Sequence, residues 1–114
     1  MKPVKPRELR EYVLSDGKSP YREWLARLDT VTRARIQARV LRFETGNLGN
    51  YKSVGAGVYE ARLDFGPGYR IYFGFEGAVI ILLLCGGSKR SQSQDIKFAQ
   101  RLWNEEVGHD QKKQ

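Results

Sequence analysis

A group of cationic and hydroxyl side chains in the second half of the sequence could bind and cleave a phosphodiester. Its members are Arg62, Arg70, Tyr72, Lys89 and Arg90. A guanidinium group donates paired hydrogen bonds to phosphate oxygens, and a tyrosine can stack on a base or hold a proton. We expect these residues, together with the strands that bear them, to form one basic sheet face.

The alternative is that these arginines have no function beyond surface ion pairs, which contribute little to stability. The candidate partners are Glu60, Asp64 and Asp95. The sequence gives little sign of a metal site or a nucleotide-binding loop. No Cys, His and carboxylate cluster has metal-ligand spacing, and no glycine-rich phosphate loop is present, so we expect no metal and no small-molecule cofactor. The single histidine, His109, lies in a polar tail where a general base would not be fixed.

A second basic group lies in the first half of the chain. Arg35, Arg39 and Arg42 recur at i, i+4 and i+7, so a helix would place them on one stripe. The stripe is either a solvated face or a surface for RNA or an acidic protein segment. Lys52 follows in a glycine-rich stretch, residues 45–56, which we expect to be a mobile loop that could also contact RNA or a partner.

The composition limits the architecture and the compartment. The chain has 114 residues and a formal charge of +7, which predicts one domain with a polyanionic partner. We expect the domain to span residues 1–107 and the polar residues 108–114 to form a disordered tail. A lone cysteine, Cys85, ends the most apolar run, and the N-terminus has no secretory pattern, so a cytoplasmic protein without a membrane span is expected.

The elements that must position these residues can be predicted from local patterns. Residues 8–14 read as a strand, Ser19-Pro20 begins a helix, and Thr30 or Thr32 caps a second helix that ends at Gly46. Three further strands are predicted over 58–64, 69–75 and 79–85. A final helix is expected to have its apolar side at Ile96, Ala99, Trp103 and Val107.

Three motifs in order resemble a known family. They are V-Y-E-A-R-L from Val58, G-P-G-Y-R-I-Y-F from Gly66, and L-L-L-C-G-G-S-K-R-S-Q-S-Q-D-I from Leu82. Over residues 10–107 the chain resembles toxins of the RelE/ParE superfamily, and within it the HigB-like "addiction module killer protein" branch. The resemblance implies a small α+β fold, with two N-terminal helices packed on an antiparallel sheet of about four strands and a C-terminal helix.

The same resemblance implies a function and partners. RelE-like members cleave messenger RNA on the ribosome without a metal, and a cognate antitoxin, expected to be of helix-turn-helix type, neutralises them. By position, Arg70 and Arg90 would stabilise the phosphate, Arg62 would orient it or transfer a proton, and Tyr72 or Lys89 would supply acid or base. Gln92 and Asp95 would satisfy backbone donors at the helix start.

The resemblance leaves one alternative open. ParE-like members of the same superfamily bind DNA gyrase and cut no RNA. Glu60 stands where RelE has a second lysine, and Ile96 stands where RelE has its catalytic tyrosine. A non-enzymatic toxin that binds a protein target is therefore the second reading of this sequence.

Overall fold

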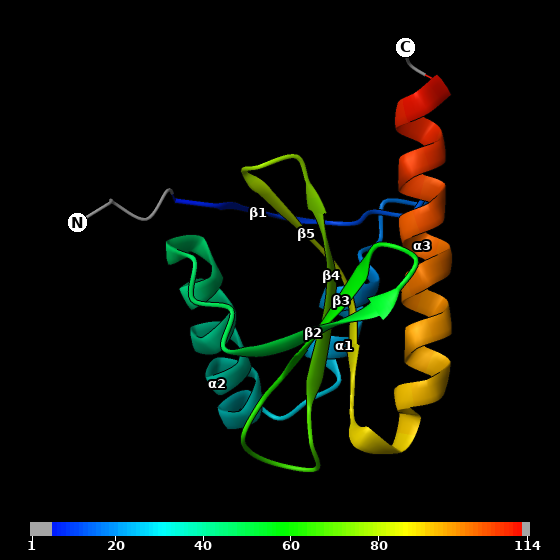
Figure 1. Ribbon diagram of the computed structural model, residues 1–114. Coiled ribbons are helices and arrows are strands. Elements are labelled where there is room, and N and C mark those ends of the chain that lie inside the picture. Colours follow the sequence, from blue (N-terminus) through cyan, green and yellow to red (C-terminus); the bar gives the residue numbers. More distant parts are fainter. Residues whose placement is uncertain (1–5, 113–114) are drawn as a thin grey trace, which may run out of the picture.

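A five-stranded mixed sheet with helices on both faces forms the molecule (Figure 1). The computed structural model describes the backbone of residues 6–112 and the side chains of residues 6–108. The strands, in the spatial order β1-β5-β4-β3-β2, are β1 (Glu8–Glu11), β5 (Ile80–Gly87), β4 (Arg70–Glu76), β3 (Val58–Arg62) and β2 (Asn50–Gly55). The helices are α1 (Pro20–Ala26), α2 (Thr30–Leu41), the 3-10 turns η1 (Arg42–Thr45) and η2 (Lys89–Ser91), and α3 (Gln92–Lys112).

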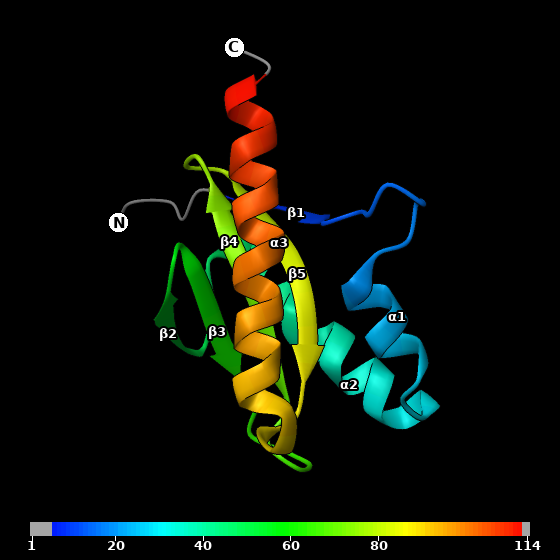
Figure 2. The same cartoon turned by 90° about the vertical axis from the view of Figure 1, so that its right-hand side faces the viewer.

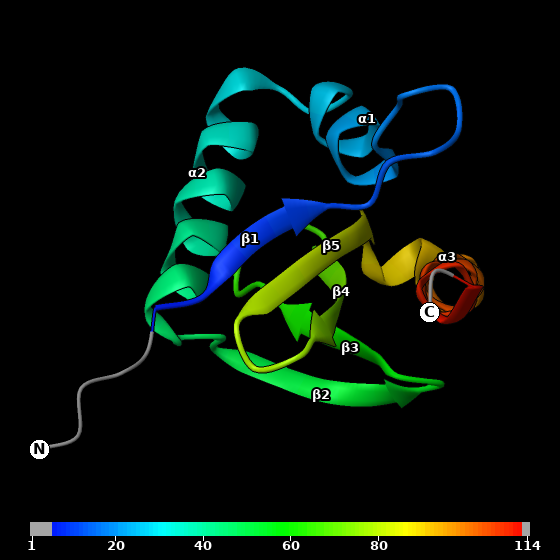
Figure 3. The same cartoon turned by 90° about the horizontal axis from the view of Figure 1, so that it is seen from above.

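Helices α1 and α2 lie on one side of the sheet and α3 lies on the other (Figures 2 and 3). Each side of the sheet has its own apolar cluster. On one face α1, α2 and η1 pack Leu25, Ile36 and Phe43 against alternate strand residues such as Ile71 and Phe73. On the other face α3 packs against a second cluster that includes Val58, Tyr72, Leu84, Ala99 and Leu102. Both faces of β4 and β5 are covered, so the apolar run that ends at Cys85 lies in the interior of the sheet.

The α+β class and the predicted strands are confirmed, but the sheet is not the expected antiparallel one of four strands. β1 pairs with β5 in parallel, with Leu9 opposite Ile81. β2 forms where a mobile loop was expected and pairs antiparallel with β3, with Lys52 opposite Glu60. The sequence of β2 conceals the strand because it is a short edge strand that is mostly exposed, so no apolar alternation is required.

The helix caps match the sequence in one case and differ in the other. Ser19 caps α1 as expected, because its side chain accepts a hydrogen bond from the Arg22 backbone N–H. The cap of α2 is Asp29 rather than Thr30 or Thr32, since its carboxylate accepts from Thr32 N–H at 2.8 Å. The helical segment then tightens into η1 and ends at Gly46, where a φ of 87° favours glycine.

Helix α3 is longer than the sequence indicated. It continues through Gly108 to Lys112, so residues 108–112 are helical where a disordered tail was expected, and 113–114 lie outside the described residues. Each residue added to an existing helix gains one hydrogen bond, so extending a helix is easier than nucleating one. In the described part of the chain, no helix is both long and apolar enough to span a bilayer.

Two tryptophans fix the helices against glycines of the central strands. A Cβ added at Gly86 of β5 would lie 2.3 Å from the Trp24 ring of α1, and one added at Gly74 of β4 would lie 2.4 Å from the Trp103 ring of α3. The absence of a side chain at these two positions lets each indole lie directly on the strand backbone. Each helix is thus placed by one aromatic contact on its own face of the sheet.

Candidate functional site

The strand register brings the polar residues of three strands together on the face that α3 partly covers. Arg62 lies opposite Arg70, which lies opposite Gly87, and Asn50 lies opposite Arg62 on the other side. The next row of the same face contains Lys52, Glu60 and Tyr72. Because directly paired residues point to the same side of a sheet, these side chains share one surface.

Arg70 is buried and paired rather than exposed. Its side chain is 5% accessible, and its Nε lies 3.6 Å from Oε1 of Glu60, whose side chain is 3% accessible. The Arg70 Nη1 donates to the Gly68 carbonyl oxygen at 2.7 Å, and the Gln92 amide donates to Glu60 Oε2 at 2.9 Å. Arg70 is therefore not exposed on the sheet face as the sequence predicted, because it is buried beside the Glu60 carboxylate.

Arg62 is the exposed cation above this pair. A hollow of about 230 Å³ is lined by Asn50, Lys52, Glu60, Arg62 and Arg70. A second hollow of about 660 Å³ also borders Arg62 and Asn50, and it extends over the turn between β3 and β4 to Lys89. Arg62 therefore stands between two concave surfaces, with Lys52 on one side and Lys89 on the other.

The turn between β3 and β4 holds Lys89 in place. The Lys89 backbone N–H donates to the Pro67 carbonyl oxygen at 3.2 Å. Gly68 has a φ of 73°, and a Cβ there would lie 3.2 Å from both Arg70 Nη1 and Lys89 Cβ. A larger residue would thus meet η2 and Arg70 together, so this glycine fixes the approach of Lys89 to the site.

Tyr72 is not available as an acid or base in this conformation. Its side chain is fully buried, and its hydroxyl has no hydrogen-bond partner among the described residues. Burial, and next the negative charge of Glu60, raise the pKa of the Tyr72 hydroxyl. The sequence placed Tyr72 on an open face, whereas α3 covers this part of the sheet.

Gln92 and Asp95 are structural, but not in the manner expected. Gln92 binds the Glu60 carboxylate instead of a backbone donor and so ties α3 to β3. Asp95 accepts a hydrogen bond from the Ser91 hydroxyl. Burial, partly opposed by this hydrogen bond, raises the pKa of Asp95. A Cβ at Gly87 would lie 1.8 Å from Asp95 Oδ2, so glycine is required for the helix start to approach β5.

The remaining predicted cations lie apart from the hollows or approach only one of them. Arg90 is exposed on η2 and lines neither hollow. The Arg35 guanidinium lies 4.0 Å from the centre of the Phe65 ring, which borders the second hollow. Arg39 folds against Gly49, where an added Cβ would lie 2.0 Å from its Nη2. Together with the exposed Arg42, these residues do not form a single exposed stripe.

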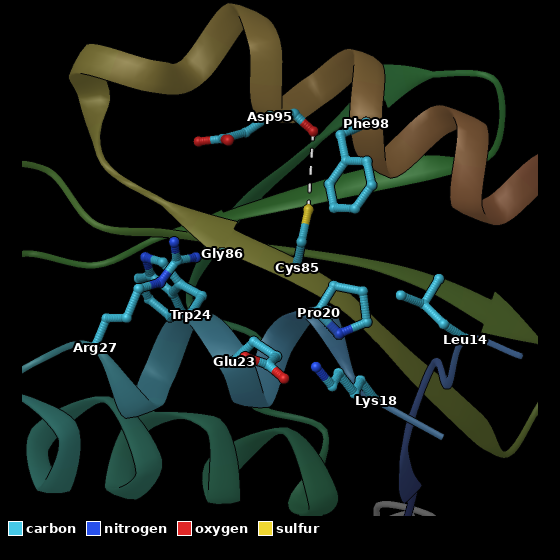
Figure 4. Close-up of a pocket in the computed structure, with 10 residues that line it drawn as sticks. All are labelled: Leu14, Lys18, Pro20, Glu23, Trp24, Arg27, Cys85, Gly86, Asp95 and Phe98. Carbon is cyan, nitrogen blue, oxygen red and sulfur yellow. Dashed lines mark hydrogen bonds between the residues drawn. The ribbon is translucent and has the colours of Figure 1, made fainter. Parts of the chain in front are cut away.

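A separate pocket of about 350 Å³ lies between α1, β5 and the start of α3 (Figure 4). The Cys85 thiol points toward α3 and donates to the Asp95 carbonyl oxygen at 3.8 Å. Burial, followed by the charge of Asp95, raises the pKa of the Cys85 thiol. Cys85 is buried, and a protonated, buried thiol is a poor nucleophile.

The arrangement around Arg62 suits an anion better than a metal ion. Among the residues that the structure describes, no group of three or more His, Cys, Asp and Glu side chains could hold a metal. Lys52, Arg62 and Lys89 are exposed donors from three separate segments, and the Asn50 amide adds a neutral donor. Sequence reasoning missed Asn50 because it did not predict β2, and it treated Glu60 only as a surface carboxylate.

Comparison with known proteins yields one clear relative. No known family profile matches the sequence. A Haemophilus influenzae protein with the description "Uncharacterized protein" is 45% identical over 83 residues, which are 72% of this chain and 84% of the relative. The chain belongs to the family of this Haemophilus influenzae protein. Because the match covers most of the Haemophilus influenzae protein, membership applies to the domain and not to a short motif.

Proposed function

We propose that this protein is the toxin of a type II toxin–antitoxin module, a HigB-like member of the RelE/ParE superfamily that cleaves messenger RNA on the ribosome without a metal. The observation that supports the proposal is the convergence of Lys52, Arg62 and Lys89 around two adjoining hollows. Three cations from three segments, with an amide beside them, can each donate to a phosphate of a nucleic-acid backbone. The protein would act in the cytoplasm and be neutralised by a helix-turn-helix antitoxin.

In the proposed reaction the ribose 2′-oxygen attacks the adjacent phosphorus, the 5′-oxygen leaves, and a 2′,3′-cyclic phosphate forms. The 2′-hydroxyl proton must be removed, and the departing 5′-oxygen must receive one. Arg62 would stabilise the negative charge that grows on the phosphoryl oxygens, and Lys52 and Lys89 would hold the flanking phosphates. Glu60 and Arg70 would act beneath the site by fixing the strands that bear Lys52 and Arg62.

A second candidate function is supported by the burial of Tyr72 and the neutralisation of Arg70. Without these two groups, the surface offers cations but no evident proton donor and acceptor pair. A toxin that binds a protein target such as DNA gyrase requires only the basic, concave surface. This is the ParE-like alternative.

Expression of the chain from an inducible promoter tests both candidates. Growth arrest should be relieved by Arg62→Ala, and transcripts should be cut at defined codon positions in cells that express the unchanged protein. Arg10→Ala is the matched control, because it removes another exposed arginine, from β1, which lines neither hollow. It should arrest growth as the unchanged protein does.

The outcomes separate the candidates. Arrest with intact transcripts and with DNA damage would favour the gyrase-binding alternative and exclude the nuclease. Arrest that persists in Arg62→Ala would remove Arg62 and its hollows from the proposal. No arrest in any strain would contradict the toxin function altogether.

A further inference from the structure

The outer face of α2 has an apolar seam that the core does not use. Its members are Val31, Ala34, Ala38 and Leu41, all of which are exposed. Val31 is 70% and Leu41 58% exposed, although Ile36 and Val40 on the opposite side of the same helix are buried. Helix α2 is therefore apolar on two sides, and only one of them contacts the sheet.

The spacing of the seam is that of a coiled-coil interface. The steps from Val31 to Ala34, Ala38 and Leu41 are three, four and three residues, which is the alternation of a and d positions in a heptad. Residues at these positions line up along one side of a helix and can insert between the side chains of a facing helix. The small side chains of Ala34 and Ala38 allow that facing helix to come close.

The seam borders a groove that is lined by both apolar and polar side chains, and its polar part includes the Glu11–Arg22 ion pair. This groove of about 820 Å³ runs between α2, β1 and the start of α1, and its lining includes Leu9, Val13, Val40, Leu41 and Leu83. Val13 is 54% exposed. Leu41 belongs to both the seam and the groove, so the apolar side chains of the groove adjoin the seam. A helix lying on the seam can thus place larger side chains into the groove.

The charged residues around the seam indicate which kind of partner helix could bind there. Every charged residue within α2 is an arginine, and Arg42 follows directly after it. Arg35 and Arg42 lie beside the seam, and no carboxylate in the described part of the chain is within ion-pair distance of either. In an antiparallel pairing of two α2 helices, the arginines that flank the seam of one copy would lie beside those of the other, and like charges would oppose the contact.

We infer that the α2 seam and its groove form a docking site for an amphipathic helix of a partner protein that carries acidic residues beside its apolar stripe. The apolar stripe packs on the seam, and the flanking carboxylates pair with Arg35 and Arg42. The inference does not depend on the proposed function, because it rests on the exposed face of α2 and not on the hollows around Arg62.

Binding of two designed peptides to the full-length protein tests this site. Both peptides are amphipathic helices of about three heptads with leucine at the a and d positions. The first has glutamate at the flanking positions, and the second has lysine there. Fluorescence anisotropy should show the glutamate peptide binding at least about tenfold more tightly than the lysine peptide. Both arginines attract the glutamates of the first peptide and repel the lysines of the second. Added salt should reduce this difference.

A matched pair of variants locates the site. Ala38→Glu places a charge in the centre of the seam, four residues before Arg42, a spacing that keeps the helix stable. Val79→Glu adds the same charge at another exposed apolar residue, 48% exposed, in the turn between β4 and β5. Binding of the glutamate peptide should fall about tenfold or more in Ala38→Glu and should stay unchanged in Val79→Glu. Circular dichroism confirms that both variants are folded.

Four results would overturn the inference. The first is equal affinity for the two peptides, and the second is unchanged binding by Ala38→Glu. The third is self-association of the unchanged protein in sedimentation that Ala38→Glu abolishes, because a second copy would then cover the seam. Fourth, if a labelled RNA oligonucleotide, and not the glutamate peptide, loses binding in Arg35→Gln/Arg42→Gln, the arginines serve a nucleic acid and the protein partner is excluded.

Discussion

The pairing of Arg62 with Arg70 across two strands poses an electrostatic problem at the scale of single residues. Like charges directly opposite each other on a sheet face repel. Glu60 lies one row away on the same face, and its carboxylate reaches Arg70 while Gln92 holds its other oxygen. One arginine is thereby neutralised below the surface, and Arg62 remains as the exposed cation.

Removal of Glu60 should be strongly destabilising. Glu60→Ala leaves the Arg70 guanidinium buried without a counter-charge, and breaking a buried pair in this way costs about 3–5 kcal/mol. Urea unfolding followed by circular dichroism measures the loss. The double variant Glu60→Leu/Arg70→Met should be more stable than Glu60→Ala, because it leaves no uncompensated charge. If the loss in the double variant equals the sum of the losses in Glu60→Leu and Arg70→Met, the two side chains do not interact.

At the scale of elements, an ion pair joins the edge strand to the first helix. Arg22 Nε of α1 donates to Glu11 Oε1 of β1 at 3.1 Å. Burial by itself would raise the pKa of Glu11, but the hydrogen bonds from Arg22 and Ser19 and the charge of Arg22 outweigh it, so the pKa is lowered. The pair helps hold β1 in register beside β5, where the strand has a neighbour on only one side.

This pair should make part of the stability depend on pH. Because the folded pKa of Glu11 is lower than its unfolded value, the stabilisation is fully present above the unfolded pKa, near 4.5, and is lost as the pH falls through the folded pKa. Glu11→Gln should lower the free energy of unfolding by up to about 1 kcal/mol at pH 7, since Arg22 is largely exposed and solvent screens the pair.

Chemical unfolding of the unchanged protein and Glu11→Gln at a series of pH values checks this dependence. The difference between the two should shrink toward zero at the acidic end. Glu8→Gln is the control, because Glu8 pairs with Arg10 on the same strand but both side chains are 54% accessible. A constant difference for Glu11→Gln at all pH values would exclude an ionic origin.

At the scale of the whole molecule, one sheet serves two cores. Phe73 and Ile71 of β4 face α1 and α2, whereas Tyr72 of the same strand faces α3. Loss of either helical layer exposes one side of β4 and β5 to water. We therefore expect the two layers to unfold together.

The two tryptophans allow this cooperativity to be measured, because Trp24 reports on the α1 face and Trp103 on the α3 face. In each of the variants Trp103→Phe and Trp24→Phe, the fluorescence midpoint in urea should coincide with the midpoint from far-ultraviolet circular dichroism. A fluorescence transition of Trp103 that precedes the loss of secondary structure would show that α3 detaches as a separate unit.

Prediction of the fold from the sequence succeeded where the signal was local. The Ser19-Pro20 helix start and the strand predicted over 58–64 follow from local sequence signals, and both are present as α1 and β3. β2 was missed because an exposed edge strand needs no such alternation. The parallel pairing of β1 with β5 joins segments about seventy residues apart, and no local pattern encodes that choice.

The sequence alone determined which residues carry charge, where the turns occur, and that several cations would lie on the β3–β4 hairpin. Only the tertiary structure decided which of these cations meets solvent. Helix α3 lies across the polar face of the sheet, so Tyr72 and Arg70 are buried and Arg62 is left exposed. The reason is physical: burial of a side chain depends on which distant segment packs over it, and that depends on the whole chain.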